Sequence, residues 1–456
     1  MRIRSIAAVL LLGCGGPTHG GSDGATQPTD AGSSDAPALP HDAGTHEAGL
    51  PDTGTREAGP AVQDCVAIPS GQWQEITPPD LHREWWCTPD FNPAGCGSPG
   101  DTGPDRIATY GAHYFALAPS APGTIYLGTS SLGLWRSTDC GANWVLADGG
   151  GSPVDVGRNW TIAVDPNDAQ TLYTTAGYAT GGVYKSTNGG TSWTQILPPK
   201  IEAVASFVEK IAMDPGNPDH LTVSFHDACL QSTTTPDLFS PGTALAGNLP
   251  AGAPQSKTSG GMPGWGCLAE TTDAGTNWTL VANALAWEGL DGPGQAMASA
   301  TTWFYASNSP TGIFLTTTGG RSPDGTSLGW IKVVSGNVPG SVYVAPDHTY
   351  YSSNGGNIIH SSNGVDWSPI PGDGIGLSSF NGSTPFVQGG SQLYAAVFSY
   401  TPPARYFVSE VNNPSFGPLS ADASAIPNGA ANLDYDSRYG VLYSSNMVGG
   451  LWRLKP

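Results

Sequence analysis

The chain has 456 residues, of which 12% are charged and 9% aromatic, together with 63 glycines and 40 prolines. This composition indicates many short strands joined by tight turns and excludes a helix-rich fold. The formal net charge of -20 excludes nucleic acid as a partner, because phosphate binding needs clustered Lys and Arg.

The N-terminus has the pattern of an export signal. Arg2 and Arg4 precede an apolar stretch over residues 6–12, which is too short to span a bilayer. The stretch closes on Leu11-Leu12-Gly13-Cys14, which resembles the lipobox of bacterial lipoproteins. The resemblance implies a signal peptide over residues 1–13, lipidation of Cys14, and a place in the bacterial cell envelope, at the outer membrane or cell surface. An ordinary signal peptide with an incidental Cys is the alternative.

Residues 14–62 form the next segment. They are nearly free of aromatic side chains and repeat Asp-Ala-Gly or Glu-Ala-Gly between scattered Pro, Ser and Thr. Such a segment cannot bury enough apolar surface to offset its ordering entropy. We expect a lipid-anchored disordered linker that holds a folded domain, residues 63–456, clear of the membrane.

One phrase recurs in the predicted folded domain, Ser/Thr-x-Asp/Asn-x-Gly-x-x-Trp. It occupies residues 137–144, 186–193 and 271–278, with a shorter copy at 361–367. It resembles the Asp-box, or bacterial neuraminidase repeat, which marks one hairpin in each blade of a β-propeller. The Asp or Asn oxygen can accept bonds from N–H groups two or three residues on, while Gly takes a positive φ and Trp packs over the hairpin. We therefore assign a structural role to Asp139, Trp144, Asn188, Trp193, Asp273, Trp278, Asn363 and Trp367.

The boxes organise the chain into units of four predicted strands, a to d from the propeller axis outward. The first three units comprise residues 114–118, 124–128, 133–136 and 144–147; 161–164, 171–174, 183–185 and 193–197; and 210–213, 221–225, 267–269 and 278–282. Four degenerate units follow, over residues 297–334, 341–370, 385–419 and 432–456. The last unit lacks strand d, and Trp73-Gln74-Glu75-Ile76 resembles the strands that follow the boxes. We predict an all-β fold, a single seven-bladed β-propeller closed by pairing of this N-terminal strand with the C-terminal blade.

The cysteines can be paired on this map. With Cys14 acylated, six cysteines remain in an exported chain, which suggests three disulfides. Neighbouring positions on the blade map predict the pairs Cys65–Cys140, Cys87–Cys96 and Cys229–Cys267. None of these cysteines has a CxxC partner or a His at ligand spacing, so we expect no metal site. We also expect no cofactor and a monomeric protein.

The connections from d to a and from b to c emerge on the face opposite the boxes. The enlarged ones place Trp beside carboxylates, which suits sugar rings and hydroxyls. Anchoring of the loops by these Trp side chains is the alternative. Candidate ligand-binding residues are Trp85, Trp86, Arg106, Arg158, Trp265 and Trp287. Candidate carboxylates for an unidentified catalytic pair are Glu84, Asp105, Asp155, Glu288 and Asp291, with Glu202 and Glu209 on the same predicted rim.

Strings such as residues 162–166 and 182–186 resemble blades of xyloglucanase-type glycoside hydrolases, the sortilin ectodomain and the photosystem II assembly factor group. Such xyloglucanases place two carboxylates between two propellers; this chain supplies one propeller, so no catalytic Asp carries over. We expect a surface-anchored, glycan-directed lipoprotein that binds polysaccharide, with glycoside hydrolysis left open. The alternative is a non-catalytic scaffold of sortilin-like type. A sialidase is less favoured, because the Arg-Ile-Pro motif typical of sialidases is absent: Arg106-Ile107 is followed by Ala108 rather than Pro. The expected partner is an extracellular glycan or a surface protein, with membrane contact through the lipid anchor only.

Overall fold

The computed structural model describes residues 65, 67–79, 81, 111–129, 132–155, 158–177, 181–197, 208–225, 267–283, 294–308, 311–320, 329–335, 341–354, 357–370, 385–399, 403–447 and 449–456. All of them belong to one compact unit, Glu57–Pro456. The predicted linker and lipidation site, and the cysteines at 87, 96 and 229, lie outside the described residues. No helix in the described ranges is long and apolar enough to cross a membrane.

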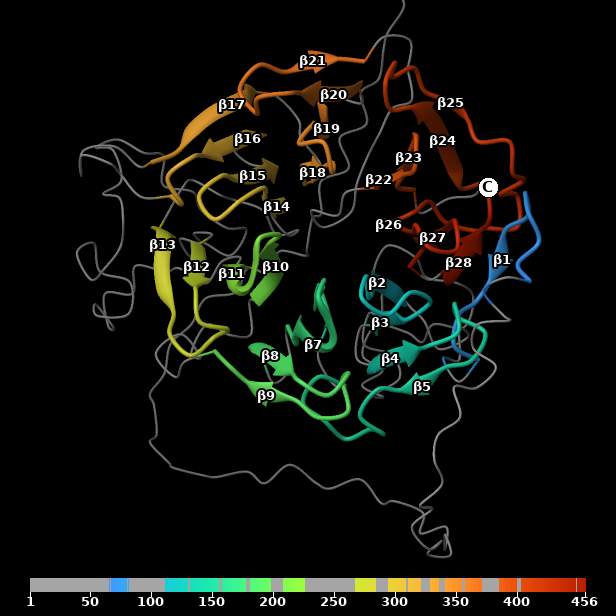
Figure 1. Cartoon of the computed structure of the whole chain (residues 1–456), viewed down its shortest axis with the longest axis horizontal. Coiled ribbons are helices and arrows are strands. Elements are labelled where there is room, and N and C mark those ends of the chain that lie inside the picture. Colours follow the sequence, from blue (N-terminus) through green and yellow to red (C-terminus); the bar gives the residue numbers. More distant parts are fainter. Residues whose placement is uncertain are drawn as a thin grey trace, which may run out of the picture. The chain divides into compact units, whose positions relative to one another are not determined.

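Seven four-stranded antiparallel sheets make up the described fold, and Figure 1 shows them arranged around a common centre in chain order. Each sheet is a blade, so the predicted seven-bladed propeller is confirmed. The first three blades consist of β2 (Ala112–Leu117), β3 (Ile125–Thr129), β4 (Leu134–Ser137) and β5 (Val145–Leu146); β6 (Ile162–Asp165), β7 (Asp168–Thr175), β8 (Val183–Ser186) and β9 (Thr194–Gln195); and β10 (Val208–Asp214), β11 (Asn217–Phe225), β12 (Cys267–Thr271) and β13 (Thr279–Asn283).

The remaining blades have lost most of the repeated phrase but keep the four strands. They consist of β14 (Gly294–Met297), β15 (Trp303–Asn308), β16 (Thr311–Thr316) and β17 (Ile331–Ser335); β18 (Tyr343–Val344), β19 (Tyr350–Asn354), β20 (Asn357–Ser361) and β21 (Ser368–Pro369); β22 (Phe386–Gly389), β23 (Gln392–Val397), β24 (Arg405–Glu410) and β25 (Gly417–Pro418); and β26 (Asn432–Asp436), β27 (Val441–Ser445), β28 (Leu451–Leu454) and β1 (Gln74–Glu75). The fourth blade corrects a predicted boundary, because its innermost strand ends at Met297 rather than beginning there.

The ring closes as predicted, by an N-terminal strand in the last blade. β1 pairs antiparallel with β28, with Gln74 opposite Arg453 and Glu75 opposite Trp452. This pairing supplies the outer strand that the C-terminal repeat lacks and covers an edge that would otherwise be open to other chains.

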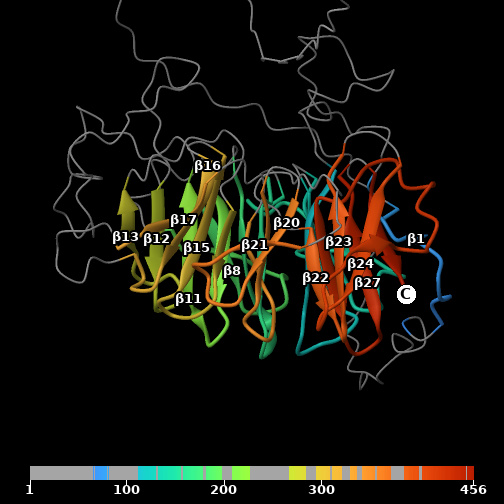
Figure 2. The same ribbon diagram turned by 90° about the horizontal axis from the view of Figure 1, so that it is seen from above.

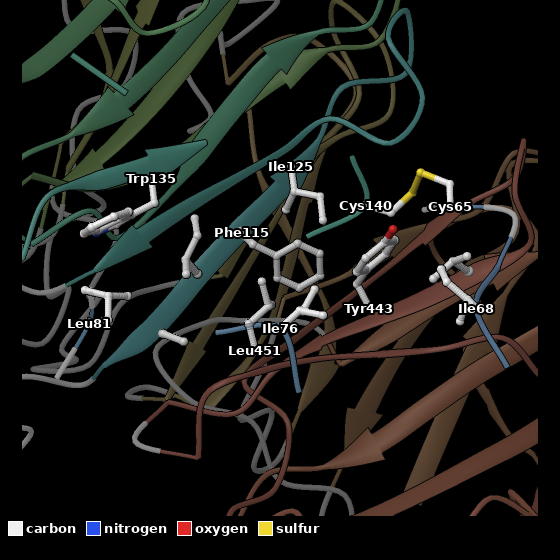
Figure 3. Close-up of a cluster of buried hydrophobic side chains, with 13 residues drawn as sticks. Cys65, Ile68, Ile76, Leu81, Phe115, Ile125, Trp135, Cys140, Tyr443 and Leu451 are labelled. Carbon is white, nitrogen blue, oxygen red and sulfur yellow. A yellow bond between two sulfur atoms is a disulfide. The ribbon is translucent and has the colours of Figure 1, made fainter. Parts of the chain in front are cut away.

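A disulfide ties the closing segment to the first blade. Cys65 and Cys140 are bonded, with a sequence separation of 75. Both lie in an apolar cluster that joins the last blade to the first, together with Phe115, Tyr443 and Leu451 (Figure 3). In the chain-entropy model, a loop of this length gives a stabilisation of about 4 kcal/mol.

The apolar core lies between the blades rather than in one central mass. Large side chains such as Phe304, Tyr126 and Tyr443 are fully buried, each within a cluster shared by two neighbouring sheets. Figure 2, turned by 90°, shows the strands of the sheets standing side by side around the ring. The centre is thereby left to the innermost strands, whose edges facing the axis have no neighbouring strand.

Candidate functional site

The strand order separates two faces of the propeller. The a–b turns and the c–d turns that contain the boxes lie at one end of the strands, which we call the box face. The b–c and d–a connections begin and end at the opposite end, which we call the ligand face. The strand ends before and after residues 76–111, 147–161, 226–266 and 284–293 all belong to the ligand face.

On the box face, the repeated phrase forms turns held by their own side chains. In the first box, Asp139 Oδ1 accepts bonds from Ser137 Oγ at 2.7 Å and from the Asn143 N–H at 2.9 Å. The Gly141 N–H donates to Ser137 Oγ at 2.9 Å, and Trp144 Nε1 donates to the Gly141 carbonyl at 3.1 Å. In the three long copies the Asp or Asn oxygen reaches an N–H four residues on, one or two beyond the predicted spacing. These groups satisfy one another and leave little for a ligand.

A degenerate box escaped the sequence analysis. In the fourth blade, Thr316 Oγ1 accepts a bond from the Gly320 N–H at 2.8 Å, which is the contact that Ser137 makes in the first box. The ring of Trp330 lies beside Gly320, as the box Trp requires. The signal was present as Thr316-Thr317-Thr318-Gly319-Gly320, but the Trp follows ten positions after Gly320 instead of three.

On the ligand face, the predicted residues Asp155 and Arg158 lie in the connection from the first blade to the second. The Asp155 carboxylate accepts a bond from the Ser152 N–H at 2.9 Å, and its backbone carbonyl accepts one from Gly133 at 3.1 Å. Burial raises the pKa of the Asp155 carboxyl, and the charge of Asp148 adds to this shift, while the bond from Ser152 opposes it. Asp155 thus stabilises the connection to which it belongs, and the second carboxylate that affects it is that of Asp148.

Arg158 pairs through its backbone with Gly177 at the end of β7, and its guanidinium lies 5.5 Å from the ring centre of Trp160. Trp160 is buried against Ala431 and Met447. The structure therefore brings Asp155 and Arg158 into one connection, whereas the candidates at 84–86, 105, 106, 265, 287, 288 and 291 lie outside the described residues.

Glu209 does not lie in a rim loop as predicted. It is part of β10 and only 2% exposed. The chain enters the innermost strand at Val208, two residues before the predicted start, so Glu209 is drawn into the blade.

A polar channel of about 380 Å³ runs through the centre of the ring. All seven innermost strands contribute to its wall, and its polar side chains are those of Tyr114, Thr161, Lys210, Gln295, Ser341, Tyr343, Asn432 and Asp434. Each innermost strand pairs on one side only, so unpaired backbone N–H and C=O groups also face the channel. The channel is therefore bounded by directional polar groups.

Two charged side chains of opposite sign line this channel. Lys210 Nζ donates to the Trp160 carbonyl at 3.0 Å and lies 4.8 Å from the ring centre of Tyr114. Burial lowers the pKa of Lys210 to about 8. Asp434 Oδ1 accepts a bond from the Tyr435 N–H at 2.8 Å, and burial raises the pKa of its carboxyl to about 6. Neither residue was among the candidates predicted from the sequence, although a charged residue in a predicted innermost strand could have indicated a polar centre.

A buried network lies in the third blade, toward the box face. His220 contacts two carboxylates, with Nδ1 3.1 Å from Asp214 Oδ2 and Nε2 2.9 Å from Glu270 Oε1. All three residues are almost completely buried. In the described part of the chain, no group of three His, Cys, Asp or Glu side chains is arranged to hold a metal ion. The carboxylates lie on opposite sides of the imidazole, so this network crosslinks strands.

No protein-family model matches the chain, and a search of curated proteins finds no match. Solved structures do resemble it. The GH74 xyloglucanase from Xanthomonas campestris aligns with a TM-score of 0.49 and 18% identity, over 75% of this chain and 52% of that one. YCF48 from Cyanidioschyzon merolae aligns with a TM-score of 0.48 and 12% identity, over 77% and 97%.

The extracellular domain of a hybrid two-component system from B. thetaiotaomicron aligns with a TM-score of 0.48 and 10% identity, over 78% of this chain and 40% of that one. The chain thus spans about half the length of the xyloglucanase. At these identities the likeness concerns the propeller fold alone.

Proposed function

We propose that this protein is a glycan-binding propeller whose site lies on the ligand face. One observation carries the proposal. The strand ends that flank residues 76–111, 226–266 and 284–293 all belong to that face, and these segments contain Trp85, Trp86, Trp265 and Trp287 together with acidic residues. Flat apolar rings beside carboxylates and amides are what sugar rings and hydroxyls require.

The box face offers no comparable site in its described part. The Ser, Thr, Asp and Asn groups of its boxes are engaged in the turns. Its tryptophans at 144, 278 and 367 each donate Nε1 to a carbonyl of their own box, whereas Trp193 Nε1 is buried without a hydrogen-bond partner among the described residues. A ligand for this propeller therefore finds its directional groups on the opposite face. Large connections on a rigid scaffold commonly carry binding.

Hydrolysis of a glycan requires catalytic groups that binding alone does not. A glycosidase needs two carboxyl groups, one protonated as donor and one ionised, at a separation of roughly 5–9.5 Å set by the mechanism. Asp155 has the raised pKa of a donor, but its carboxylate is engaged in its own loop. We therefore propose binding as the function and leave the partner carboxylate to experiment.

The test is a panel of plant, bacterial and animal polysaccharides, incubated with the full chain in detergent. Retention of the protein on each polymer and release of new reducing ends are followed together. Retention without release supports the proposal, and release extends it to a glycoside hydrolase. If neither signal appears on any polymer, the glycan proposal fails and a protein-binding scaffold takes its place.

We also propose that Cys14 carries the lipid anchor. The support is the sequence Leu11-Leu12-Gly13-Cys14 after a short apolar stretch, followed by a long segment poor in apolar residues. Radiolabelled palmitate fed to expressing bacteria should be incorporated into the wild-type protein and not into Cys14→Ser. Equal labelling of the two proteins would contradict the anchor.

A further inference from the structure

The channel holds two charges that lack ionic partners within the described chain. A buried charge is costly unless an opposite charge or several hydrogen bonds compensate it. No carboxylate of the described residues lies within ion-pair distance of Lys210 Nζ, whose polar contact is the single bond to the Trp160 carbonyl. The charge of Glu209 partly offsets the lowering of the Lys210 pKa by burial, although Glu209 does not form an ion pair with Lys210. Two of the three ammonium N–H groups of Lys210 are left for other acceptors.

Asp434 is in the corresponding situation with the opposite sign. Its Oδ1 has the bond from Tyr435, while Oδ2 receives only a long contact of 3.4 Å from the Leu117 N–H. No Lys, Arg or His among the described residues forms an ion pair with it. Asp434 is half-buried, and it lines the channel. Neutral Asn432, two residues earlier in β26, instead donates to the Phe115 carbonyl at 3.1 Å.

Both charges belong to the same cavity. Lys210 lies on β10 of the third blade and Asp434 on β26 of the last, so they face the channel from well-separated positions on the ring. Tyr114 on β2 lies beside Lys210, whose Nζ is 4.8 Å from its ring centre. Burial raises the pKa of the Tyr114 hydroxyl, and the charge of Asp434 adds to this shift. Burial raises the pKa of Tyr343 in the fifth blade, and the charge of Asp434 adds to this shift. A molecule in the channel would therefore meet the ammonium of Lys210 from β10 and the carboxylate of Asp434 from β26.

We propose that the central channel binds a small zwitterion, a molecule that carries both a carboxylate and a protonated amine. Its carboxylate is held by Lys210, and its amine is held by Asp434. Such a ligand supplies an opposite charge to each of the two side chains. The volume of about 380 Å³ lies within the range of roughly 300–1,000 Å³ that small-ligand sites occupy. This site is separate from the proposed glycan site and does not depend on it.

Isothermal titration of the full chain with a series of ω-amino acids tests the proposal. The series runs from glycine through β-alanine, 4-aminobutanoate and 5-aminopentanoate to 6-aminohexanoate, with the alkylamine and the alkanoate of each length as singly charged controls. We expect affinity to peak at one chain length, which reports the gap between the two charges. At that length each singly charged control should bind at least tenfold more weakly. No binding by any member, or equal binding by the controls, overturns the proposal.

Two variants assign the ends of the ligand. Lys210→Met keeps the apolar stem and should remove the preference for the zwitterion over the amine. Asp434→Asn keeps the shape of the carboxyl and should remove the preference over the alkanoate. Each should weaken zwitterion binding at least tenfold. The control is Lys332→Met. Lys332 belongs to β17, the outer strand of the fourth blade, where it lies against Phe314 and away from the channel. Unchanged binding by both channel variants would overturn the proposal, and thermal unfolding of each variant verifies that it is folded.

Discussion

Arg453 donates a hydrogen bond of 2.6 Å from Nη1 to the backbone carbonyl of Cys140, and so joins the last blade to the box of the first. Arg136 makes the same bond, at 2.7 Å, to Gly189 in the box of the second blade. Both arginines follow the sequence Gly-Leu-Trp in strand c, and both acceptors are the fourth residue of a box. The repeat therefore encodes a contact between blades as well as a turn within one.

Loss of this contact should weaken the closure of the ring. Arg453→Met is expected to lower the free energy of unfolding by about 2 kcal/mol, because hydrogen bonds to charged groups contribute roughly 1.5–3 kcal/mol. Urea denaturation measures the change. Arg438→Met is the control, since Arg438 lies exposed in the a–b turn of the same blade. Equal stability of the two variants would contradict a role in closure.

His220 should make stability depend on pH. Burial opposes its charge, but its hydrogen bonds to Glu270 and Asp214 and their charges outweigh burial and raise the pKa of His220 above 6.5. The folded state then holds the proton more tightly than the unfolded state. The resulting stabilisation is complete below pH 6.5 and disappears as the pH rises through the pKa of the folded state.

Urea denaturation between pH 5.5 and 8.5 should show this decline in the wild type, and a flatter profile in His220→Gln. His348→Asn serves as the control, because His348 occupies an a–b turn in the fifth blade with a φ of 62°, which Asn tolerates. A pH profile of His220→Gln that matches the wild type would contradict the assignment.

Ala274 should be replaceable by Gly with a gain in stability. It occupies the fourth position of the third box with a φ of 57°, where the second box has Gly189 at 65°. An L-residue with a side chain is strained there, so Ala274→Gly should raise the free energy of unfolding by about 1 kcal/mol. In the first box, Ala142 has no positive φ, and Ala142→Gly should be neutral or destabilising. Matching effects of the two substitutions would contradict the explanation.

Asp434→Asn should also stabilise the fold. Burial raises the pKa of Asp434 from 3.8 to about 6, so the folded state favours the protonated form and loses stability as the pH rises from 3.8 through 6. Removal of the charge should restore up to about 3 kcal/mol at pH 7.5, at 1.36 kcal/mol per pKa unit. Lower stability of Asp434→Asn at that pH would contradict this. A substitution that stabilises the protein and abolishes zwitterion binding would mark Asp434 as a residue kept for binding.

The boxes made the architecture predictable, because a turn held by its own side chains requires Ser or Thr, Asp or Asn, Gly and Trp at fixed positions. Residues 73–76 were assigned to the last blade by the same logic, through their likeness to the strands after the boxes, and the pairing of β1 with β28 confirms it. The pair Cys65–Cys140 followed from neighbouring places on the blade map and is present in the structure.

The innermost strands were harder to predict. Gly294-Gln295-Ala296 in β14 has little of the apolar pattern of a buried strand, since its inner edge faces the polar channel. The same edge accommodates Lys210 and Asp434, whose importance depends on how closely seven strands approach one another. A sequence motif specifies one turn, whereas the channel is formed by residues from the whole ring, and no local pattern specifies it.

The glycan proposal rests most directly on the tryptophans of the ligand-face segments. Affinity electrophoresis in gels that contain the best-retained polysaccharide compares the wild type with Trp265→Ala/Trp287→Ala, and with Val365→Ala, whose side chain is exposed at the box face. We predict that the double variant loses at least tenfold in retention with an unchanged unfolding midpoint, while Val365→Ala behaves as the wild type. Full retention by the double variant would contradict a glycan site at these side chains.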